Sequence, residues 1–325
     1  MSAAEPARQP LAQCRICDTT LAGLPRLGVP EVMQGTYQLF DYVRCVSCGC
    51  LQIDLIPDNL SRFYEPGYYS YGSTAKGASR AFVARLRDRS SALGRPLLGR
   101  PLAAAVPDRK LQALRGLDLT RRTSVLDVGS GSGGMLLALR AIGIDDVLGV
   151  DPFLPEDKQL NNGVRVAAVP LDRIDRADWD IITFNHSLEH IPDQVAIIES
   201  ALARLAPGGT IVVRVPTCDS AAFEQYGADW VQIDAPRHIY LHSRQSLSLT
   251  AKRAGGRVVR LVDDSDEYQF WGSAHCRSLT GPTSRRLEDT RKSLPGRSIA
   301  LMRLRAWLRN RRGEGDQVVA YIKTA

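Results

Sequence analysis

From residue 124 onward, short apolar runs alternate along the chain with segments in which apolar residues recur at helical spacing. Five apolar runs have the length of buried strands and cover residues 124–128, 147–150, 164–169, 179–184 and 210–215. Runs at 258–261 and 317–322 predict two more strands. Strands that alternate with helices are typical of βα units on a parallel sheet. We therefore expect an α/β fold with a seven-stranded sheet and helices on both of its faces.

Three helices are predicted between these strands from apolar spacing and from the residues that begin or end them. They cover 135–142, a segment that opens at Pro192 and is stopped by the Pro-Gly-Gly of 207–209, and 243–254. A fourth helical pattern, IALMRLRAWLRNRR, lies in a basic insertion near 281–312, between the last two strands.

Composition divides the chain into three predicted parts. Residues 1–72 hold five of the seven cysteines, residues 73–122 form a basic helical linker or lid, and residues 123–325 form the main domain. Charge is uneven, with a net +9 over 76–122 and +7 over 281–325, although the whole chain carries only +7. Such basic segments fit an anionic substrate or surface, and they fit equally well helical faces that are simply solvated.

The first residues, MSAAEPARQP, lack the apolar core of a secretory signal, and no apolar run reaches the length of roughly 18 residues that spans a membrane. We therefore expect no transmembrane segment and a cytoplasmic location. Thiols stay reduced in that compartment, so paired cysteines indicate metal ligands or redox groups before disulfides.

Two Cys-x-x-Cys pairs stand near the N-terminus: Cys14 with Cys17, and Cys45 with Cys48. Each pair places two thiolates on one tight turn, and two such turns supply the four sulfurs of a tetrahedral zinc site. Four thiolates leave no open coordination position, so the predicted Zn²⁺ is structural. Cys50 is an alternative ligand, but the spacing favours Cys48.

A glycine-rich loop, GSGSGG, follows the first predicted strand of the main domain and runs into a helix. Its glycines also fit the dinucleotide pattern G-x-G-x-x-G, which leaves a nicotinamide-dependent oxidoreductase open. Asp127, just before the loop, would repel a pyrophosphate and suits a cofactor that carries an ammonium and a sulfonium. Asp151 ends the next strand, at a spacing that suits ribose hydroxyls, and Pro152 and Phe153 can flank an adenine.

Four segments together, VLDVGSGSGG, GVDP, NHSLEHIPD and LAPGG, resemble in order and spacing the class I S-adenosylmethionine-dependent methyltransferases. The resemblance implies a Rossmann-like methyltransferase sheet over roughly residues 120–265. It also implies roles for individual residues. Asp127, Gly129 and Gly131 would hold the methionine end of S-adenosylmethionine, Asp151 its ribose, and Asn185 and His186 would border the sulfonium and the acceptor.

A narrower resemblance rests on CRIC and CVSCG, on FYEPGYYSYG, and on the later DAPRHIYLHS and DEYQFWGS. These segments are similar to bacterial methyltransferases with an N-terminal zinc ribbon, often encoded beside polysaccharide or deoxysugar genes. The resemblance implies a small-molecule or glycan acceptor, and O-methylation of a sugar in polysaccharide or secondary-metabolite biosynthesis. C-methylation of a ketosugar is the alternative, but members with that activity usually carry a further C-terminal domain.

A hydroxyl acceptor needs a base, and histidine is suited to that role near neutral pH. Of the five histidines, His238 is the first candidate and His186 the second, since both follow predicted strands whose carboxyl ends border the cofactor. Two structural alternatives stay open: Arg237 and His238 would instead only tie their loop to the core, and His190 with Glu189 would brace the helix that follows.

Two further functions stay open at this point. The zinc ribbon and basic segments would suit an RNA methyltransferase that grips phosphates, although no nucleic-acid signature is present and we expect no nucleic-acid partner. The chain would otherwise be a non-catalytic scaffold that retained the fold. The sequence makes no prediction of oligomeric state.

Overall fold

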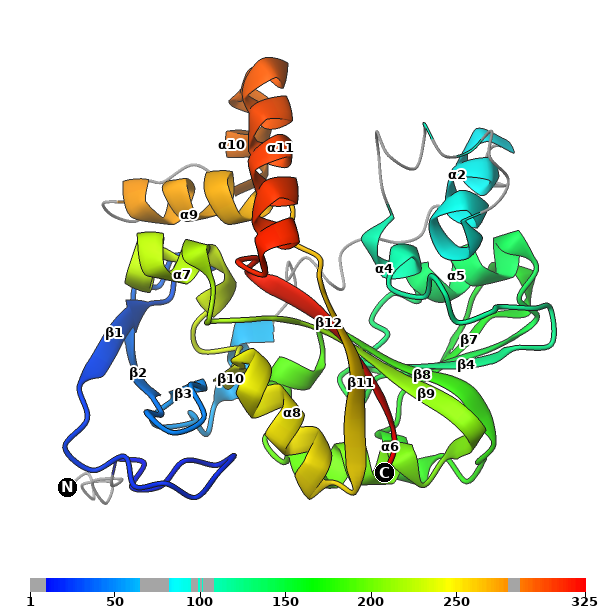
Figure 1. Cartoon of the computed structure of the whole chain (residues 1–325), viewed down its shortest axis with the longest axis horizontal. Coiled ribbons are helices and arrows are strands. Elements are labelled where there is room, and N and C mark those ends of the chain that lie inside the picture. Colours follow the sequence, from blue (N-terminus) through cyan, green and yellow to red (C-terminus); the bar gives the residue numbers. More distant parts are fainter. Residues whose placement is uncertain (1–9, 65–81, 95–98, 100, 102–107, 280–286) are drawn as a thin grey trace. The chain divides into compact units, whose positions relative to one another are not determined.

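The computed structural model describes residues 10–64, 82–94, 99, 101, 108–279 and 287–325 (Figure 1). It divides into two compact units. Unit 1 takes its residues from 1–64, 216–250 and 263–318, and unit 2 from 65–215, 251–262 and 319–325. Part of the predicted linker 73–122 lies outside the described residues. Among the helices that the structure describes, none has both the length and the apolar character needed to cross a membrane.

Unit 2 is built on an eight-stranded sheet in the order β11-β12-β9-β8-β4-β5-β7-β6. These strands are, in chain order, β4 (Ser124–Val128), β5 (Asp146–Val150), β6 (Lys158–Gln159), β7 (Arg165–Ala167), β8 (Trp179–Asn185), β9 (Leu205–Pro216), β11 (Gly256–Asp263) and β12 (Gln317–Thr324). All seven predicted strands are present, and the α/β prediction is confirmed. The eighth strand is β6, a two-residue edge strand antiparallel to β7; so short a segment has no apolar pattern to mark it.

The centre of this sheet is β4, which is buried along its whole length and pairs in parallel with β5 on one side and β8 on the other. Because the chain leaves β4 in one direction and β8 in the other, right-handed crossovers place their following helices on opposite faces. Figure 1 shows those helices, α5 (Gly134–Ile142) and α6 (Gln194–Leu202), on the two sides of the sheet. The carboxyl ends of β4, β5 and β8 therefore meet at one edge.

Side chains from one face of the sheet and from three helices form the main core of unit 2. The helices are α2 (Phe82–Leu93), α4 (Arg109–Gln112) and α5, and their buried residues pack against Val125, Ile181 and Val212 of three neighbouring strands. The buried residues of α5 are Met135, Leu136, Ala138, Leu139 and Ile142. Burial of this stripe fixes α5 over β4, and so fixes the loop that joins them.

The segment after α6 differs from the prediction. The helix ends at Leu202, and the Pro-Gly-Gly that was expected to stop it lies inside β9 instead. The register between β8 and β9 shifts there, from Trp179 opposite Leu205 to Ile181 opposite Thr210. Gly208 has a φ of +81°, and a Cβ on Gly209 would lie 2.9 Å from the carbonyl oxygen of Trp179. The glycines therefore allow a bulge in β9. In the sequence, Pro-Gly-Gly looks the same whether it ends a helix or forms a bulge in a strand.

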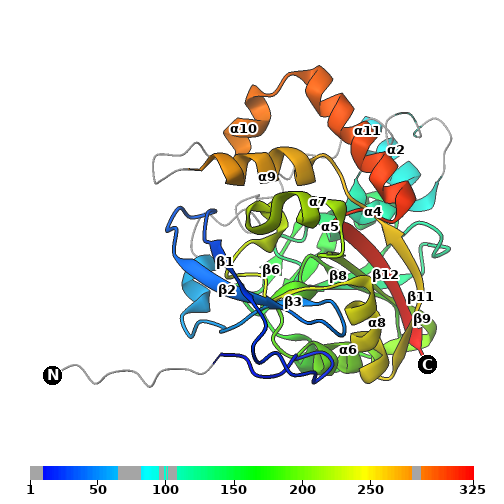
Figure 2. The same cartoon turned by 60° about the vertical axis from the view of Figure 1, so that its left-hand side comes forward.

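Unit 1 contains a four-stranded sheet in the order β1-β2-β3-β10. Three strands come from the N-terminal segment, β1 (Arg26–Pro30), β2 (Leu39–Arg44) and β3 (Leu51–Ile53), and they appear in blue in Figure 2. The fourth, β10 (Tyr240–Leu241), pairs antiparallel with β3 across almost 190 residues of sequence. A single hydrophobic core joins the two segments and includes Tyr42, Phe63 and Trp230.

The remaining described helices of unit 1 are α7 (Ala221–Tyr226), α9 (Tyr268–Ser278), α10 (Leu287–Ser293) and α11 (Gly296–Arg312). A further helix, α8 (Arg244–Arg253), corresponds to the predicted 243–254 and runs from unit 1 into unit 2. The helix predicted in the basic insertion is α11, and Gly313 in the left-handed conformation ends it.

Candidate functional site

The glycine loop joins β4 to α5, and its backbone requires glycine at the first position. Gly129 has a φ of +74°, and a Cβ there would lie 2.4 Å from the Cβ of Ser187. Gly131 and Gly133 also have positive φ, at 54° and 70°. The N–H of Gly129 donates to the Val150 carbonyl at 2.8 Å, which holds the loop against the end of β5. Only a chain without side chains at these points can turn this tightly.

Asp127 lies one residue before the end of β4 and is buried. It stands opposite Thr183 in the β4–β8 register, so its Oδ1 accepts a hydrogen bond of 2.6 Å from the Thr183 hydroxyl. Burial raises the pKa of Asp127 to about 6, although the Thr183 hydrogen bond lowers it. A buried carboxylate with one hydroxyl donor retains acceptor capacity for a cationic or N–H-bearing ligand.

Asp151 follows β5 directly and faces the same loop. Its Oδ2 accepts from the N–H of Gly131 at 2.9 Å and its Oδ1 from the N–H of Phe153 at 3.0 Å. Burial raises the pKa of Asp151, and the two hydrogen bonds lower it by a smaller amount. Each oxygen retains a lone pair, so the carboxylate can accept from a pair of neighbouring hydroxyls. Pro152 and Phe153 are exposed beside it.

Two buried polar atoms beside the loop have no hydrogen-bond partner among the described residues: the Oγ of Ser130 and the Oδ1 of Asn185. The Nδ2 of Asn185 contacts the Met135 sulfur at 3.5 Å, which fixes the direction of the amide. Buried polar groups are nearly always satisfied in a working protein, so these two atoms are candidates for contact with a polar ligand. Sequence reasoning proposed Asn185 and missed Ser130, Thr183 and Ser187, which lie in the loop or on neighbouring strand ends.

His186 follows β8 immediately and lies in unit 2 with the loop. Its φ of 54° is unusual for a residue with a side chain. Its Nδ1 is 3.1 Å from the Oε1 of buried Glu189. A carboxylate can only accept, so in the neutral ring Nδ1 carries the proton and Nε2 the lone pair.

His238 is buried within unit 1. Its Nδ1 lies 2.7 Å from the Gln232 carbonyl oxygen. A carbonyl oxygen can only accept a hydrogen bond, so in the neutral ring Nδ1 carries the proton and Nε2 the lone pair. That Nε2 is 3.9 Å from the Oδ2 of Asp234. The residues of the loop belong to unit 2 and His238 to unit 1, so its part in the site stays a prediction.

Next to His238 is a buried ion-pair network that the sequence alone did not reveal. The Nη2 of Arg237 contacts Asp234 Oδ1 at 2.5 Å and Glu31 Oε1 at 3.2 Å, and its Nε donates to Asp234 Oδ2 at 3.0 Å. Its Nη1 donates to the carbonyl of Phe63. The network ties the loop before β10 to the N-terminal segment, which agrees with the structural alternative proposed for Arg237.

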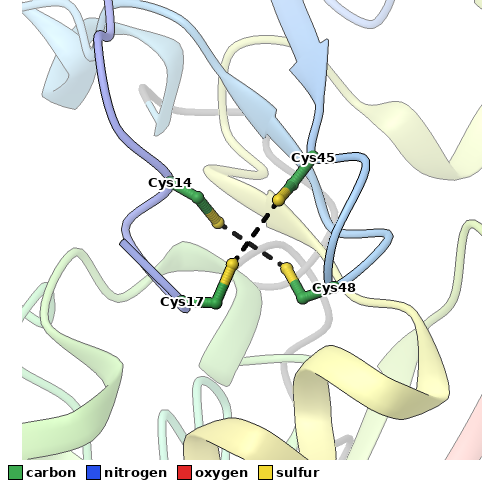
Figure 3. A group of neighbouring side chains, drawn as sticks. All are labelled: Cys14, Cys17, Cys45 and Cys48. Atoms are coloured by element: carbon green, nitrogen blue, oxygen red, sulfur yellow. Dashed lines mark hydrogen bonds between the residues drawn. The ribbon is translucent and has the colours of Figure 1, made fainter. Parts of the chain in front are cut away.

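The four cysteines Cys14, Cys17, Cys45 and Cys48 lie together, with every sulfur within 4.8 Å of the others. Figure 3 shows the sulfurs converging from the two Cys-x-x-Cys turns. Cys14 and Cys48 are 3.6 Å apart and Cys17 and Cys45 are 3.5 Å apart, close to the roughly 3.8 Å between sulfurs around a tetrahedral Zn²⁺ with bonds of about 2.3 Å.

The surroundings of this cluster favour a thiolate at Cys14, whereas burial raises the pKa of the Cys45 thiol. The hydrogen bond with Cys48 lowers the pKa of Cys14 to about 4, and the same contact raises the pKa of Cys48. The Nε2 of buried Gln52 donates to the Cys14 sulfur at 3.1 Å, as does the N–H of Ile16 at 3.4 Å. Cys50 lies outside the group; its sulfur is directed to the Leu51 carbonyl oxygen at 3.7 Å.

A family model described as a methyltransferase domain matches residues 84–261. The curated relatives include the ubiquinone biosynthesis O-methyltransferase of Bordetella avium, which is 33% identical over 174 residues, 48% of this chain and 71% of the relative. The protein of the same name from Psychrobacter arcticus is 30% identical over 36% of this chain, and the chain spans only 51% of its length. Among solved structures, an S-adenosylmethionine-dependent methyltransferase from Archaeoglobus fulgidus has 18% identity and a TM-score of 0.41, covering 69% of this chain and 93% of that one.

Proposed function

Because the chain belongs to the methyltransferase-domain family and is an S-adenosylmethionine-dependent methyltransferase, we propose that it methylates a hydroxyl oxygen of a small, sugar-like acceptor. The bound cofactor supplies an electrophilic methyl group on a sulfonium. The protein has to align the acceptor oxygen with that methyl, exclude water and remove the hydroxyl proton. The family match also decides between the two cofactors that the glycine pattern left open.

The acidic, glycine-lined edge of the sheet in unit 2 is the observation that supports this proposal most directly. Asp127, Gly129 and Gly131 would hold the amino-acid end of the cofactor, where the buried carboxylate faces positive charge. Asp151 would accept from the two ribose hydroxyls, with Pro152 beside the adenine. The unpartnered Oδ1 of Asn185 fits a donor of the same ligand.

Proton removal is proposed to involve His238 or His186. In both rings the hydrogen bond at Nδ1 leaves the lone pair on Nε2, where a hydroxyl proton would be accepted. A catalytic base and a structural residue respond differently to replacement. Replacing a base by Gln lowers kcat, whereas replacing a residue that only ties its loop in place changes stability instead.

Support for the acceptor comes from two directions. The segments around the zinc ligands and after β9 resemble methyltransferases of polysaccharide biosynthesis, and a nucleotide sugar is anionic, which fits the +7 charge of the chain. A second candidate is an acceptor of ubiquinone biosynthesis, favoured by the names of the two relatives. Both candidates place the methyl group on oxygen.

Calorimetry with S-adenosylmethionine tests the cofactor site. We expect Asp127→Ala to abolish measurable binding, and the matched control Asp157→Ala, which removes an exposed carboxylate, to leave the affinity unchanged. Equal affinity in both variants would contradict the role proposed for Asp127.

Formation of S-adenosylhomocysteine, measured with a panel of nucleotide sugars, a catechol and an RNA transcript, tests the acceptor. We expect turnover with a sugar hydroxyl. Turnover confined to the catechol would assign the second candidate, and turnover confined to RNA would overturn both.

We also propose that the four-cysteine cluster binds one structural Zn²⁺. The sulfur spacing and the Gln52 donor fit a closed tetrathiolate site with an outer hydrogen bond to one ligand. The ion would cross-link two turns of the N-terminal segment. A reducing compartment such as the cytoplasm would keep the thiols available for it.

A further inference from the structure

We propose that α11 docks on the surface of a membrane that contains anionic phospholipid. The helix has 17 residues, Gly296–Arg312, and is therefore about 25 Å long. Figure 2 shows it as the last of three successive helices in unit 1, after α9 and α10. This docking is separate from methyl transfer, since no residue of α11 belongs to the proposed cofactor or zinc site.

One face of α11 exposes large apolar side chains. Leu301, Leu304, Trp307 and Leu308 have exposed fractions of 58%, 53%, 51% and 39%. Their spacing of three, three and one residues places them on the same side of an α-helix. Scattered single leucines on a protein surface need no explanation, but four large apolar residues on two turns of one helix mark a surface for interaction.

The same helix carries six arginines and no acidic residue. Arg297, Arg305, Arg311 and Arg312 are exposed on or beside the apolar face. The Arg311 guanidinium lies over the Trp307 ring at 4.7 Å, so cation and indole stand together. Leucine and tryptophan between arginines are the composition of helices that lie in the plane of an anionic bilayer.

The opposite face holds the helix to unit 1. Ala306 is buried, Arg303 pairs with Glu267 at 3.1 Å, and Arg309 donates to Gln269 at 3.1 Å and to Gln225 at 2.9 Å. The Asn310 side chain exchanges two further hydrogen bonds with the backbone of Ser265. These contacts fix the rotation of α11 and keep the apolar face directed outward.

Charge decides between a membrane and the other possible partners. A second copy of the chain packing on this face through a two-fold axis would bring arginines against arginines. A nucleic acid would pair with the arginines but would leave the leucines and Trp307 in water. An anionic bilayer satisfies both kinds of side chain, with headgroup phosphates for the guanidinium groups and acyl chains for the apolar ones.

Co-sedimentation of the full chain with lipid vesicles tests the proposal. We expect binding to phosphatidylcholine vesicles that contain about one third phosphatidylglycerol, weakening as salt is raised, and little binding to pure phosphatidylcholine. Leu304→Glu with Leu308→Glu should reduce the binding at least about ten-fold. The matched control is Leu55→Glu, which adds charge at another exposed leucine of unit 1 and should bind as the wild type does.

Tryptophan fluorescence gives a second readout, because Trp307 is exposed whereas Trp179, Trp230 and Trp271 are buried. A blue shift on addition of the anionic vesicles, absent in Trp307→Phe, is expected. Binding that survives the double Glu variant, or no binding to anionic vesicles at about 0.1 M salt, would overturn the proposal. So would a dimer that the double variant dissociates, or RNA binding that the double variant leaves intact.

Discussion

The Arg237 network offers the sharpest test of how unit 1 is held together. Replacing Arg237 by Met removes a guanidinium that contacts both Glu31 and Asp234. The side chains of Arg237 and Glu31 are fully buried, and that of Asp234 nearly so, so the two carboxylates cannot regain water without opening the fold. Methionine has a similar volume, and therefore the charge rather than the packing is what changes.

The cost follows from this burial. Breaking a buried ion pair by removing one partner typically costs about 3–5 kcal/mol, because the remaining charge stays desolvated. At roughly 2–4 °C per kcal/mol for a unit of this size, we expect the melting temperature to fall by about 6–20 °C. The measurement is thermal unfolding followed by near-ultraviolet circular dichroism at pH 7.

Two controls separate the charge effect from general damage. Arg277→Met removes an exposed arginine of the same unit, paired with Asp229, and should cost less than about 1 kcal/mol. Adding Glu31→Gln and Asp234→Asn to Arg237→Met removes the unpaired charges and should recover part of the loss. If Arg237→Met unfolds no earlier than the Arg277 control, or if the triple variant is the least stable of the three, the reasoning is wrong.

Three other outcomes are expected. Gly129→Ala should weaken S-adenosylmethionine binding at least about ten-fold by calorimetry, because the new Cβ meets Ser187 at a positive φ. Gly143→Ala, where φ is also positive but the space is open, should not. Since burial raises the pKa of Asp127 to about 6, its carboxylate is protonated as pH falls below that value, so affinity for the cationic cofactor should drop about ten-fold per pH unit below 6; a flat profile from pH 7 to 5 would count against it. Cys45→Ser should lose the zinc that atomic emission detects in the purified protein and should unfold at lower temperature, while Cys276→Ser retains one zinc per chain; equal metal content would remove the proposed site.

The sequence predicted well those parts of the fold that depend on local patterns of residues. The run 124–128 coincides with β4, and the glycine loop after it lies where expected, because an apolar run followed by glycines needs no distant partner to be recognised. The four cysteines are a similar case, since the spacing within each pair fixes its turn. We predicted that the two pairs lie together because a tetrathiolate site is the stable arrangement of two such turns.

What the sequence could not predict depends on partners far along the chain. Arg237 and Glu31 are 206 residues apart, and neither has a neighbour that marks the other. β10 is two residues long and has no periodicity, yet it completes the sheet of the N-terminal segment. Gln52 donates a hydrogen bond to the Cys14 sulfur from β3, and the pairing of β3 with β2 that positions it is known only from the folded unit.

Unit 1 is assembled from separate stretches of chain, and this has a consequence for the order of events during synthesis. All four cysteines are made before β3 and long before β10, so the proposed metal site could form early. The free edge of β3, however, has no β10 to pair with until residue 240 has been made, and every strand from β4 to β9 is made before that residue. An unpaired strand edge is open to wrong partners throughout that interval. The nascent protein therefore exposes this strand edge through a long stage of its synthesis, which metal binding at the proposed cysteine site would not end.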